Sequence, residues 1–529
     1  MGRVFLLDCT LRDGGYVNDW QFGNDAIKGI ARKIAKTGVE FFEIGFIKDC
    51  DFNKDRAVFP DIQTIEPFIT PKSDSMKYVG MIDCSSPVPI ENIKKRNDNS
   101  IDGIRVIFKK NKRDFAFDYC SQIQEKGYML FVQFVGTDSY SDIEFVESIE
   151  RFNTLNPYAM SIVDTFGTIK RKTFLRMVYL ADNNMRPGIV LGYHAHNNLQ
   201  QALGNAQTLV ELNLKRDVCI DACVFGMGRG AGNLNLELFA DYMNENYSTS
   251  YNIEPMLEIM DDYLQESYSK RFWGYCLPYY LSATNNCHPN YAIYYAEKQT
   301  LTEKSFNELL KSIPSESKRI YSKDSAEKYY EEYMSKFYDD HADVERLKKQ
   351  LEGRNILLLA PGNSINEKEM LIKQTVKETD SIVIAINCNP ENYKVDFIFS
   401  CNIRRYARLE NKEARKIITS NMKDSQHYDY MLNFSTYSIE EKDVIDNSGL
   451  MFLKFLSGIN VKNVYIAGMD GYSSKMNYFD TPLDYEVSHI ENQNRLIQKN
   501  IMELSKRLNI SFVTDSIYKS IPADMSGVS

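Results

Sequence analysis

The chain has 529 residues, a formal net charge of −9, and hydrophobic and charged fractions of 43% and 26%. This length exceeds what one hydrophobic core fills, so several domains are expected. No basic run marks a nucleic-acid partner, and no apolar run approaches the roughly 18 residues of a membrane span. The short apolar start is no signal peptide, and ten cysteines that stand singly form no disulfide framework. A cytoplasmic protein with small-molecule ligands is therefore expected.

The first half of the chain alternates short, apolar, β-branched runs with segments of helical period. This pattern is typical of βα units and a parallel sheet. Between the first two runs, Ile27, Ile30 and Ile34 repeat at helical spacing, and Gly38 stands where a helix should end. Eight such units favour a (β/α)8 TIM barrel over residues 1–240, because this fold typically needs about 250 residues. The expected strands are residues 4–8, 39–44, 78–83, 103–108, 129–135, 159–164, 189–194 and 218–225.

Polar side chains follow several of these strands, where a barrel places its active site. The first strand ends in DCTLRDGGYVNDW, and the seventh ends in GYHAHNN with His194 and His196. Residues i and i+2 of a strand share a face, so the two imidazoles are expected to point together, as ligands of a divalent metal do. Asp13 is the candidate third ligand, because only the eighth strand separates the first from the seventh. Two further strand-end carboxylates are candidate substrate-binding or rim hydrogen-bonding residues, Glu43 and Asp164.

A glycine-rich loop, FGMGRGAGNLNLE at residues 225–237, follows the eighth strand. Its glycines match a loose dinucleotide-binding fingerprint, but that fingerprint belongs after the first strand of an open βαβ unit. We prefer a tight backbone turn that brings Asn233 to the metal site.

Helical patterns dominate residues 241–353. The aromatic segment WGYCLPYYLSATNNCHPNYA surrounds His288 and predicts a helical cap near the barrel mouth. The charged residues 322–353 predict a solvated linking helix.

A second α/β domain of Rossmann-like type is expected over residues 354–529. Its apolar runs are NILLLAPGNS, DSIVIAIN, DFIFS, VKNVYIAGMDG and ISFVTDS. The first run leads into a turn at what should be a helix N-terminus, a natural phosphate site. The candidate nucleotide-binding residues are Gly362, Asn363, Ser364, Asn387, Ser448, Gly449 and Asp470.

Three motifs in order, D-x-T-L-R-D-G, H-x-H-N and the loop ending in Gly-Asn, resemble the metal-dependent pyruvate-type aldolases and acyl lyases. This barrel family includes 4-hydroxy-2-oxovalerate aldolase, hydroxymethylglutaryl-CoA lyase and isopropylmalate synthase, and the first of these is the most similar. The resemblance implies Mn²⁺ or Mg²⁺ held by Asp13, His194 and His196, with Asn233 as a candidate fourth ligand. The ion would chelate a 2-oxo acid, and Arg12 would stabilise the enolate.

One position departs from this family. Two places after the R-D-G glycine, the hydroxy-oxo-acid aldolases have a histidine that handles the substrate hydroxyl proton, and this chain has Tyr16. A phenol with a pKa near 10 is a poor base at neutral pH. The acid/base role is therefore open between Tyr16, His288 and a bound water.

The succession of motifs in residues 354–520 looks like the nucleotide-binding fold of bacterial sialyltransferases that use CMP-sugars. His489 falls roughly where those enzymes have their catalytic histidine. The resemblance implies a nucleotide or nucleotide-sugar ligand for the second domain.

Three hypotheses follow. The first is a class II aldolase that forms or cleaves the carbon-carbon bond between a pyruvate-like 2-oxo acid and an aldehyde or ketone. A nucleotide-linked sugar in surface polysaccharide biosynthesis is a candidate carbonyl partner. The second adds a glycosyltransferase activity in the C-terminal half. The third is a non-catalytic metal- and nucleotide-binding protein, which the retained metal residues disfavour. Barrel enzymes of this kind commonly associate, so a homo-oligomer is expected.

Overall fold

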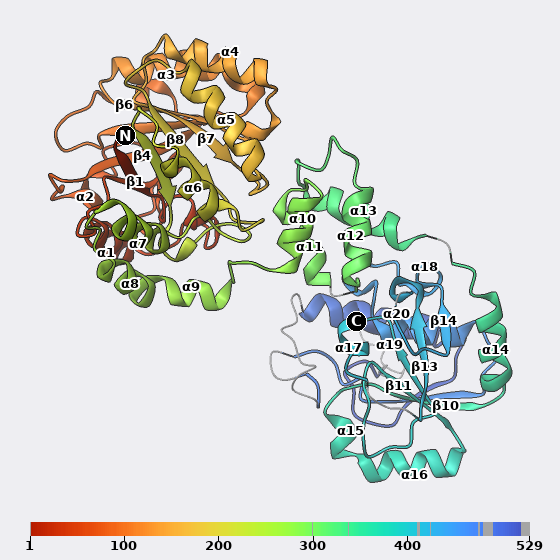
Figure 1. Ribbon diagram of the computed structural model, residues 1–529. Helices are drawn as coiled ribbons and strands as arrows, with labels where there is room; N and C mark the ends of the chain where they lie inside the picture. Colours follow the sequence, from red (N-terminus) through yellow and green to blue (C-terminus); the bar gives the residue numbers. More distant parts are fainter. Residues whose placement is uncertain are drawn as a thin grey trace. The chain divides into compact units, whose positions relative to one another are not determined.

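The protein divides into two compact units, each with its own parallel sheet (Figure 1). The computed structural model describes residues 2–298, 300–336, 338–409, 413–423, 425–473, 477–479 and 490–519. The first unit comprises Met1–Ile293 and Ser315–Ile320, and the second comprises Tyr294–Pro314 and Tyr321–Ser529. The division falls inside the region where a single helical cap and linker were expected, so part of that region belongs to each unit.

The first unit is a closed barrel of eight parallel strands, as the sequence predicted. The order β1-β9-β8-β7-β6-β5-β4-β2 closes because β1 also pairs with β2. A ninth strand that the sequence did not predict, β3 (Val58–Phe59), extends β2 outside the barrel. The barrel strands are β1 (Val4–Asp8), β2 (Phe41–Ile47), β4 (Lys77–Asp83), β5 (Gly103–Phe108), β6 (Met129–Phe134), β7 (Ala159–Asp164), β8 (Val190–Ala195) and β9 (Val218–Ala222).

Helices surround the barrel and bury their apolar stripes against it (Figure 1). In the first of them, Ile27, Ile30 and Ile34 are fully buried, which is the stripe seen in the sequence. The chain then turns and reaches Gly38 at a positive φ of 85°. The helices are α1 (Asn24–Ile34), α2 (Glu66–Ile69), α3 (Arg113–Glu125), α4 (Asp142–Asn153), α5 (Arg171–Asn184), α6 (Ala202–Glu211) and α7 (Leu236–Tyr247).

The inside of the barrel has an apolar layer below a polar one. The apolar layer includes Phe41, Phe131, Ala159 and Cys219. Because alternate residues of a strand share a face, the residue two places after each apolar side chain points inward one layer higher. Those positions carry polar residues at the carboxyl end of the barrel, namely Glu43, Gln133, Ser161 and Asp221.

Helices follow the barrel through residue 351. They are α8 (Glu254–Ile259), a helical turn at Met260–Leu264, α9 (Gln265–Lys270), α10 (Leu277–Thr284), α11 (Pro289–Lys298), α12 (Glu303–Ser312), α13 (Lys323–Met334) and α14 (His341–Leu351). The expected solvated linking helix is wrong, because α13 and α14 are separate. Both are packed, since Ala326, Tyr330 and Leu347 are fully buried.

The second unit contains a seven-stranded parallel sheet in the order β14-β13-β12-β11-β10-β15-β16. Figure 1 shows α15 and α16 on one side of this sheet and α19 and α20 on the other. The sequence analysis missed β13, which begins with two charged residues, and β14, which has only three residues. The strands are β10 (Asn355–Leu359), β11 (Ile382–Ile386), β12 (Phe397–Ser400), β13 (Arg415–Thr419), β14 (Tyr430–Leu432), β15 (Asn463–Ala467) and β16 (Ile510–Phe512). The helices are α15 (Ser364–Glu367), α16 (Glu369–Thr379), α17 (Ile403–Tyr406), α18 (Phe434–Tyr437), α19 (Ser448–Ser457) and α20 (Ile490–Leu504).

Within the described ranges, none of the helices combines the length and apolar character that crossing a membrane requires.

Candidate active site

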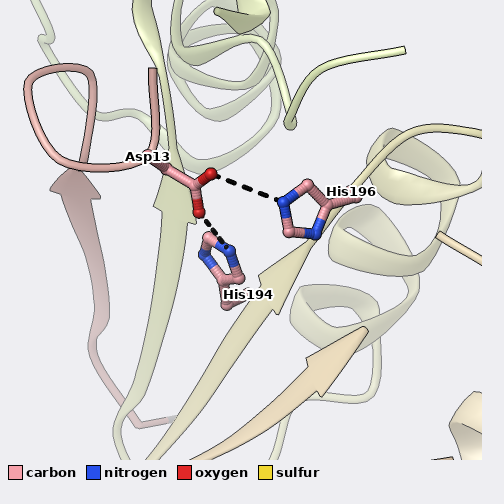
Figure 2. A group of neighbouring side chains, drawn as sticks. All are labelled: Asp13, His194 and His196. Atoms are coloured by element: carbon pink, nitrogen blue, oxygen red, sulfur yellow. Dashed lines mark ion pairs between the residues drawn. The ribbon is translucent and has the colours of Figure 1, made fainter. Parts of the chain in front are cut away.

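Asp13, His194 and His196 meet at the carboxyl end of the barrel (Figure 2). Asp13 lies in the turn after β1, and the two histidines lie at the end of β8 and just beyond it. Asp13 Oδ2 is 2.9 Å from His194 Nε2, and Asp13 Oδ1 is 3.4 Å from His196 Nε2. One ligand atom from each residue lies within 4.8 Å of the others. The predicted convergence of these three residues is therefore present.

Both imidazoles are oriented by acceptors on their other nitrogen. His194 Nδ1 is 3.1 Å from Asp221 Oδ2, and His196 Nδ1 is 3.2 Å from the backbone carbonyl oxygen of Asp164. Neither oxygen can donate, so each Nδ1 carries a proton and Nε2 is directed toward Asp13. Histidines that bind metals are held in this way, with the ring nitrogen that does not bind the metal donating to a carboxylate or carbonyl.

Two buried oxygens in this cluster have no hydrogen-bond partner among the described residues, Asp13 Oδ1 and Asn233 Oδ1. Asn233 Nδ2 donates to the carbonyl oxygen of Met227 at 2.9 Å, which fixes the amide plane. The Asn233 backbone also bridges to that of His196, so the glycine-rich loop brings Asn233 to the cluster. Two imidazole nitrogens with carboxylate and amide oxygens form a donor set that fits a divalent ion.

The electrostatics favour positive charge at this position. Burial opposes ionisation of Asp13, but Arg12 and the two histidines hold the pKa of its carboxyl well below the usual range. Burial also works against a charged His194, yet the carboxylates of Asp13 and Asp221 raise its pKa well above the usual value. The carboxylates of Asp13 and Asp221 thus favour positive charge beside them.

A ring of buried charges supports the cluster from below. Arg12 donates from Nε to Glu43 Oε2 at 2.7 Å and from Nη1 to Asp13 Oδ2 at 2.6 Å. Arg105 lies 3.0 Å from Glu43 Oε2 and also forms an ion pair with Asp221, the acceptor of His194. Sequence reasoning missed Arg105 and Asp221. The available signal was a charged residue inside each of two apolar strands, GIRVIF and VCIDA.

The two carboxylates predicted to bind substrate or to form hydrogen bonds at the barrel rim both have partners within the protein. Glu43 is fully buried and pairs with the guanidinium groups of Arg12 and Arg105. The Asp164 carboxylate accepts the backbone N–H groups of Thr168 and Ile169, each at 2.9 Å. Burial raises the pKa of Asp164 to about 7. Both side chains therefore have the protein partners expected of rim hydrogen-bonding residues, and contact of either one with a substrate stays a prediction.

Tyr16 is packed among aromatic and cationic groups beside the cluster. Its ring lies 4.8 Å from Trp20, centroid to centroid, and the guanidinium carbon of Arg229 lies 4.2 Å from its centre. Burial, assisted by the charge of Asp13, raises the pKa of Tyr16 above its usual value. The phenol therefore keeps its proton at neutral pH, which argues further against Tyr16 as a general base.

His288 belongs to the same unit as the barrel and contacts the glycine-rich loop. Its Nε2 is 3.4 Å from Arg229 Nη1, and its Nδ1 accepts the Asn290 backbone N–H at 3.1 Å. Burial, together with the charges of Arg229, Lys109 and His196, lowers the pKa of His288 to about 4. Arg229 thus contacts both Tyr16 and His288. The sequence analysis did not identify Arg229 as a candidate site residue.

The second unit has a cavity of about 840 Å³ at the carboxyl ends of β10, β11 and β15. The strand order reverses between β10 and β15, and ligands of open parallel sheets bind at such a switch point. Five predicted residues line the cavity: Gly362, Asn387, Ser448, Gly449 and Asp470. The lining also includes residues outside the strand-end motifs, which no sequence motif marks as ligand-binding. They include Lys298, Glu327, Arg405 and Tyr518.

The turn after β10 differs from the expected phosphate site. The Ser364 backbone N–H donates to Asp470 Oδ2 at 2.9 Å, and the Ser364 hydroxyl also bonds to this carboxylate. An anion from the chain therefore occupies the position expected for phosphate, and α15 has only four residues. Asn363 precedes Ser364 in the same turn and occupies the N-cap position of α15. Asn387 Nδ2 donates to Ser448 Oγ at 2.7 Å, whereas His489 lies outside the described residues.

Comparisons with known proteins match the barrel. Residues 91–262 match the family model described as HMGL-like. Oxaloacetate decarboxylase from Mycobacterium tuberculosis is 24% identical over 234 residues, which are 44% of this chain and 67% of that protein. 4-Hydroxy-2-oxovalerate aldolase from Pseudoalteromonas translucida is 22% identical over 266 residues, 49% of this chain and 74% of that protein. The HMG-CoA lyase structure from Brucella melitensis is 16% identical with a TM-score of 0.40, covering 49% of this chain and 96% of that one.

Proposed function

Because the barrel is HMGL-like and homologous to 4-hydroxy-2-oxovalerate aldolase, we propose that it is a divalent-metal-dependent lyase. It makes or breaks a carbon-carbon bond between a pyruvate-like 2-oxo acid and an aldehyde or ketone. The observation that carries this proposal is the cluster of Asp13, His194 and His196, in which both histidines present Nε2 to one carboxylate. These three residues and Asn233 would hold Mn²⁺ or Mg²⁺. When bound, the ion supplies a Lewis acid for the keto group.

Arg12 places a fixed positive charge beside the cluster. Two of its three nitrogens already donate to Glu43 and Asp13, so the guanidinium is oriented before substrate arrives. A preorganised cation of this kind stabilises the negative charge that develops on the enolate oxygen during carbon-carbon bond cleavage or formation.

Tyr16 and a bound water share the proton transfers in this proposal. Tyr16 keeps its proton, so it donates a hydrogen bond to the substrate oxygen that becomes or leaves a hydroxyl group. His288 is neutral at pH 7. Its Nδ1 accepts the Asn290 backbone N–H and its Nε2 carries the proton, so the base in this proposal is a bound water. This division explains how a chain with tyrosine in place of the family's histidine retains both an acid and a base.

Enolisation of pyruvate tests the proposal. The protein with Mn²⁺ should exchange the methyl protons of pyruvate with solvent deuterium, followed by NMR. His194→Ala should lose both bound metal and exchange, whereas His341→Ala, a change at the start of α14 in the second unit, should keep both. Absence of exchange with pyruvate and other short 2-oxo acids would refute the function, and full metal occupancy in His194→Ala would refute the ligand assignment.

The cavity of the second unit supports a second proposal, that this Rossmann-like unit binds a nucleotide or a nucleotide-linked sugar. Its position at the switch point of the sheet favours this ligand class. Sugar transfer in polysaccharide biosynthesis is the wider form of the proposal and rests on sequence resemblance. Calorimetry with CMP, UMP and GMP should detect binding that Ser448→Ala weakens and the surface change Ser505→Ala does not. If none of the three nucleotides gives a heat of binding, the proposal is refuted.

A further inference from the structure

Arg229 is a half-buried arginine at the barrel mouth that makes no ion pair with the described residues. Its guanidinium lies against the Tyr16 ring and faces the His288 imidazole. The other arginines near the mouth are paired, Arg12 with Asp13 and Glu43, and Arg319 with Asp138 at 2.5 Å. Removing a guanidinium from water is costly unless an anion compensates its charge. The described residues around Arg229 supply aromatic and imidazole contacts but no such anion.

The loop holds Arg229 in a fixed position beside the metal cluster. A Cβ on Gly228 would lie 2.2 Å from Asn233 Nδ2, so the backbone before Arg229 packs directly on that candidate ligand. On the other side, the Ala231 backbone N–H donates to Asn198 Oδ1 at 2.8 Å. Arg229 is therefore anchored on both flanks, and a group bound by it would lie close to the reacting atoms.

His288 presents a second donor to the same space. Because the Asn290 backbone N–H donates to His288 Nδ1, the neutral ring carries its proton on Nε2. That nitrogen faces Arg229 Nη1 at 3.4 Å, so an arginine N–H and an imidazole N–H converge. An oxyanion that accepts from both would receive a charge-assisted pair of hydrogen bonds.

We propose that Arg229 and His288 bind a second anionic group of the substrate, on the carbonyl partner rather than on the 2-oxo acid. This inference rests on the proposed aldolase function and narrows its substrate class to partners that carry a carboxylate or phosphate. The role of Arg229 is in specificity, since Arg12 already provides the cation next to the metal ligands.

Calorimetry on the full chain with Mn²⁺ tests this inference. The ligands are pairs of unreactive compounds whose two members differ by one anionic group. Malate and 2-hydroxybutyrate differ by a carboxylate in place of a methyl group, and 3-phosphoglycerate and glycerate differ by a phosphate. The wild-type protein should bind the more anionic member of at least one pair about tenfold more tightly or better, because a charge-assisted hydrogen bond is worth about that much. The pair with the larger preference identifies carboxylate or phosphate as the recognised group.

Arg229→Gln should abolish this preference, and Arg229→Lys should retain part of it. Arg319→Gln is the matched control, an arginine of the same unit that already has a carboxylate partner, and it should keep the preference. Equal binding of both members by the wild-type protein, or an unchanged preference in a folded Arg229→Gln protein, would overturn the inference. Pyruvate exchange measured in parallel separates the two proposals, because lost exchange with an intact Arg229-dependent preference refutes only the aldolase function.

Discussion

At the scale of single residues, Asp221 determines how His194 faces Asp13. Its carboxylate accepts from His194 Nδ1 and pairs with Arg105, which links the metal cluster to the charge ring beneath it. The side chains of Asp221, His194 and Arg105 are almost fully buried. In such surroundings each charge depends on its partner, and removal of one leaves the others uncompensated.

Asp221→Asn should weaken Mn²⁺ binding about 10- to 100-fold, because an outer partner of a metal-binding histidine is lost. It should also lower the free energy of unfolding by about 3 kcal/mol, since Arg105 loses a buried carboxylate. Calorimetry and urea unfolding measure the two effects. Asp217→Asn, which breaks a more exposed pair with Arg3, is the control and should leave metal affinity unchanged. Wild-type metal affinity in Asp221→Asn would contradict the orienting role.

His288 should make stability depend on pH. Burial and nearby positive charges lower its pKa in the folded state to about 4, whereas the unfolded chain titrates near 6.5. Between these values the unfolded chain binds more protons, so the contribution of His288 to the free energy of unfolding falls as pH falls from about 6.5 to about 4. His288→Gln should therefore lose less stability than the wild-type protein over this interval in urea titrations. Equal losses would show that His288 is protonated in the folded state.

At the scale of elements, an irregularity in β2 shapes the site. The pairing of β2 with β4 shifts register between Glu43 and Phe46, and Gly45 lies in the shifted segment with φ at 154°. Glu43 consequently points into the barrel toward Arg12, while the Phe46 ring lies 6.2 Å from that of Tyr16. One strand thus positions both the charge ring and the aromatic wall beside it.

Gly45→Ala should lower the free energy of unfolding by about 1–3 kcal/mol, the usual cost of a strained backbone position. An added Cβ would lie 2.1 Å from the carbonyl oxygen of Ala57, so the backbone must shift. Gly204→Ala in α6 is the control, because its Cβ would meet nothing within 4 Å and alanine favours helix. Chemical denaturation compares the two, and a Gly45→Ala protein as stable as the wild type would show that β2 tolerates the shift.

At the scale of the whole molecule, two units carry two different sites. Each has its own sheet and buried core, and the cluster of Asp13, His194 and His196 lies in a different unit from the cavity at β10, β11 and β15. A ligand that binds only the folded form of one unit stabilises that unit by mass action.

Calorimetric melting of the full chain should therefore show two transitions. Mn²⁺ at about 100 times its dissociation constant should stabilise only the barrel transition, by about 2.7 kcal/mol. The His194→Ala protein should show no such shift, while its other transition stays in place. A single transition that moves as a whole with Mn²⁺ would mean that the two units unfold together.

The sequence by itself determined the barrel strands and the convergence of Asp13 with His194 and His196. Both depend on local periodicity, since strand residues alternate between two faces and parallel strands end at one edge. Tertiary structure decided the rest. Asp221 is 116 residues from Arg105, and Arg229 is 59 residues from His288. Such contacts follow from packing between distant segments. The same is true of the cavity lining and of the hydrogen bond from the Ser364 backbone N–H to the Asp470 carboxylate. No local pattern in the chain specifies them.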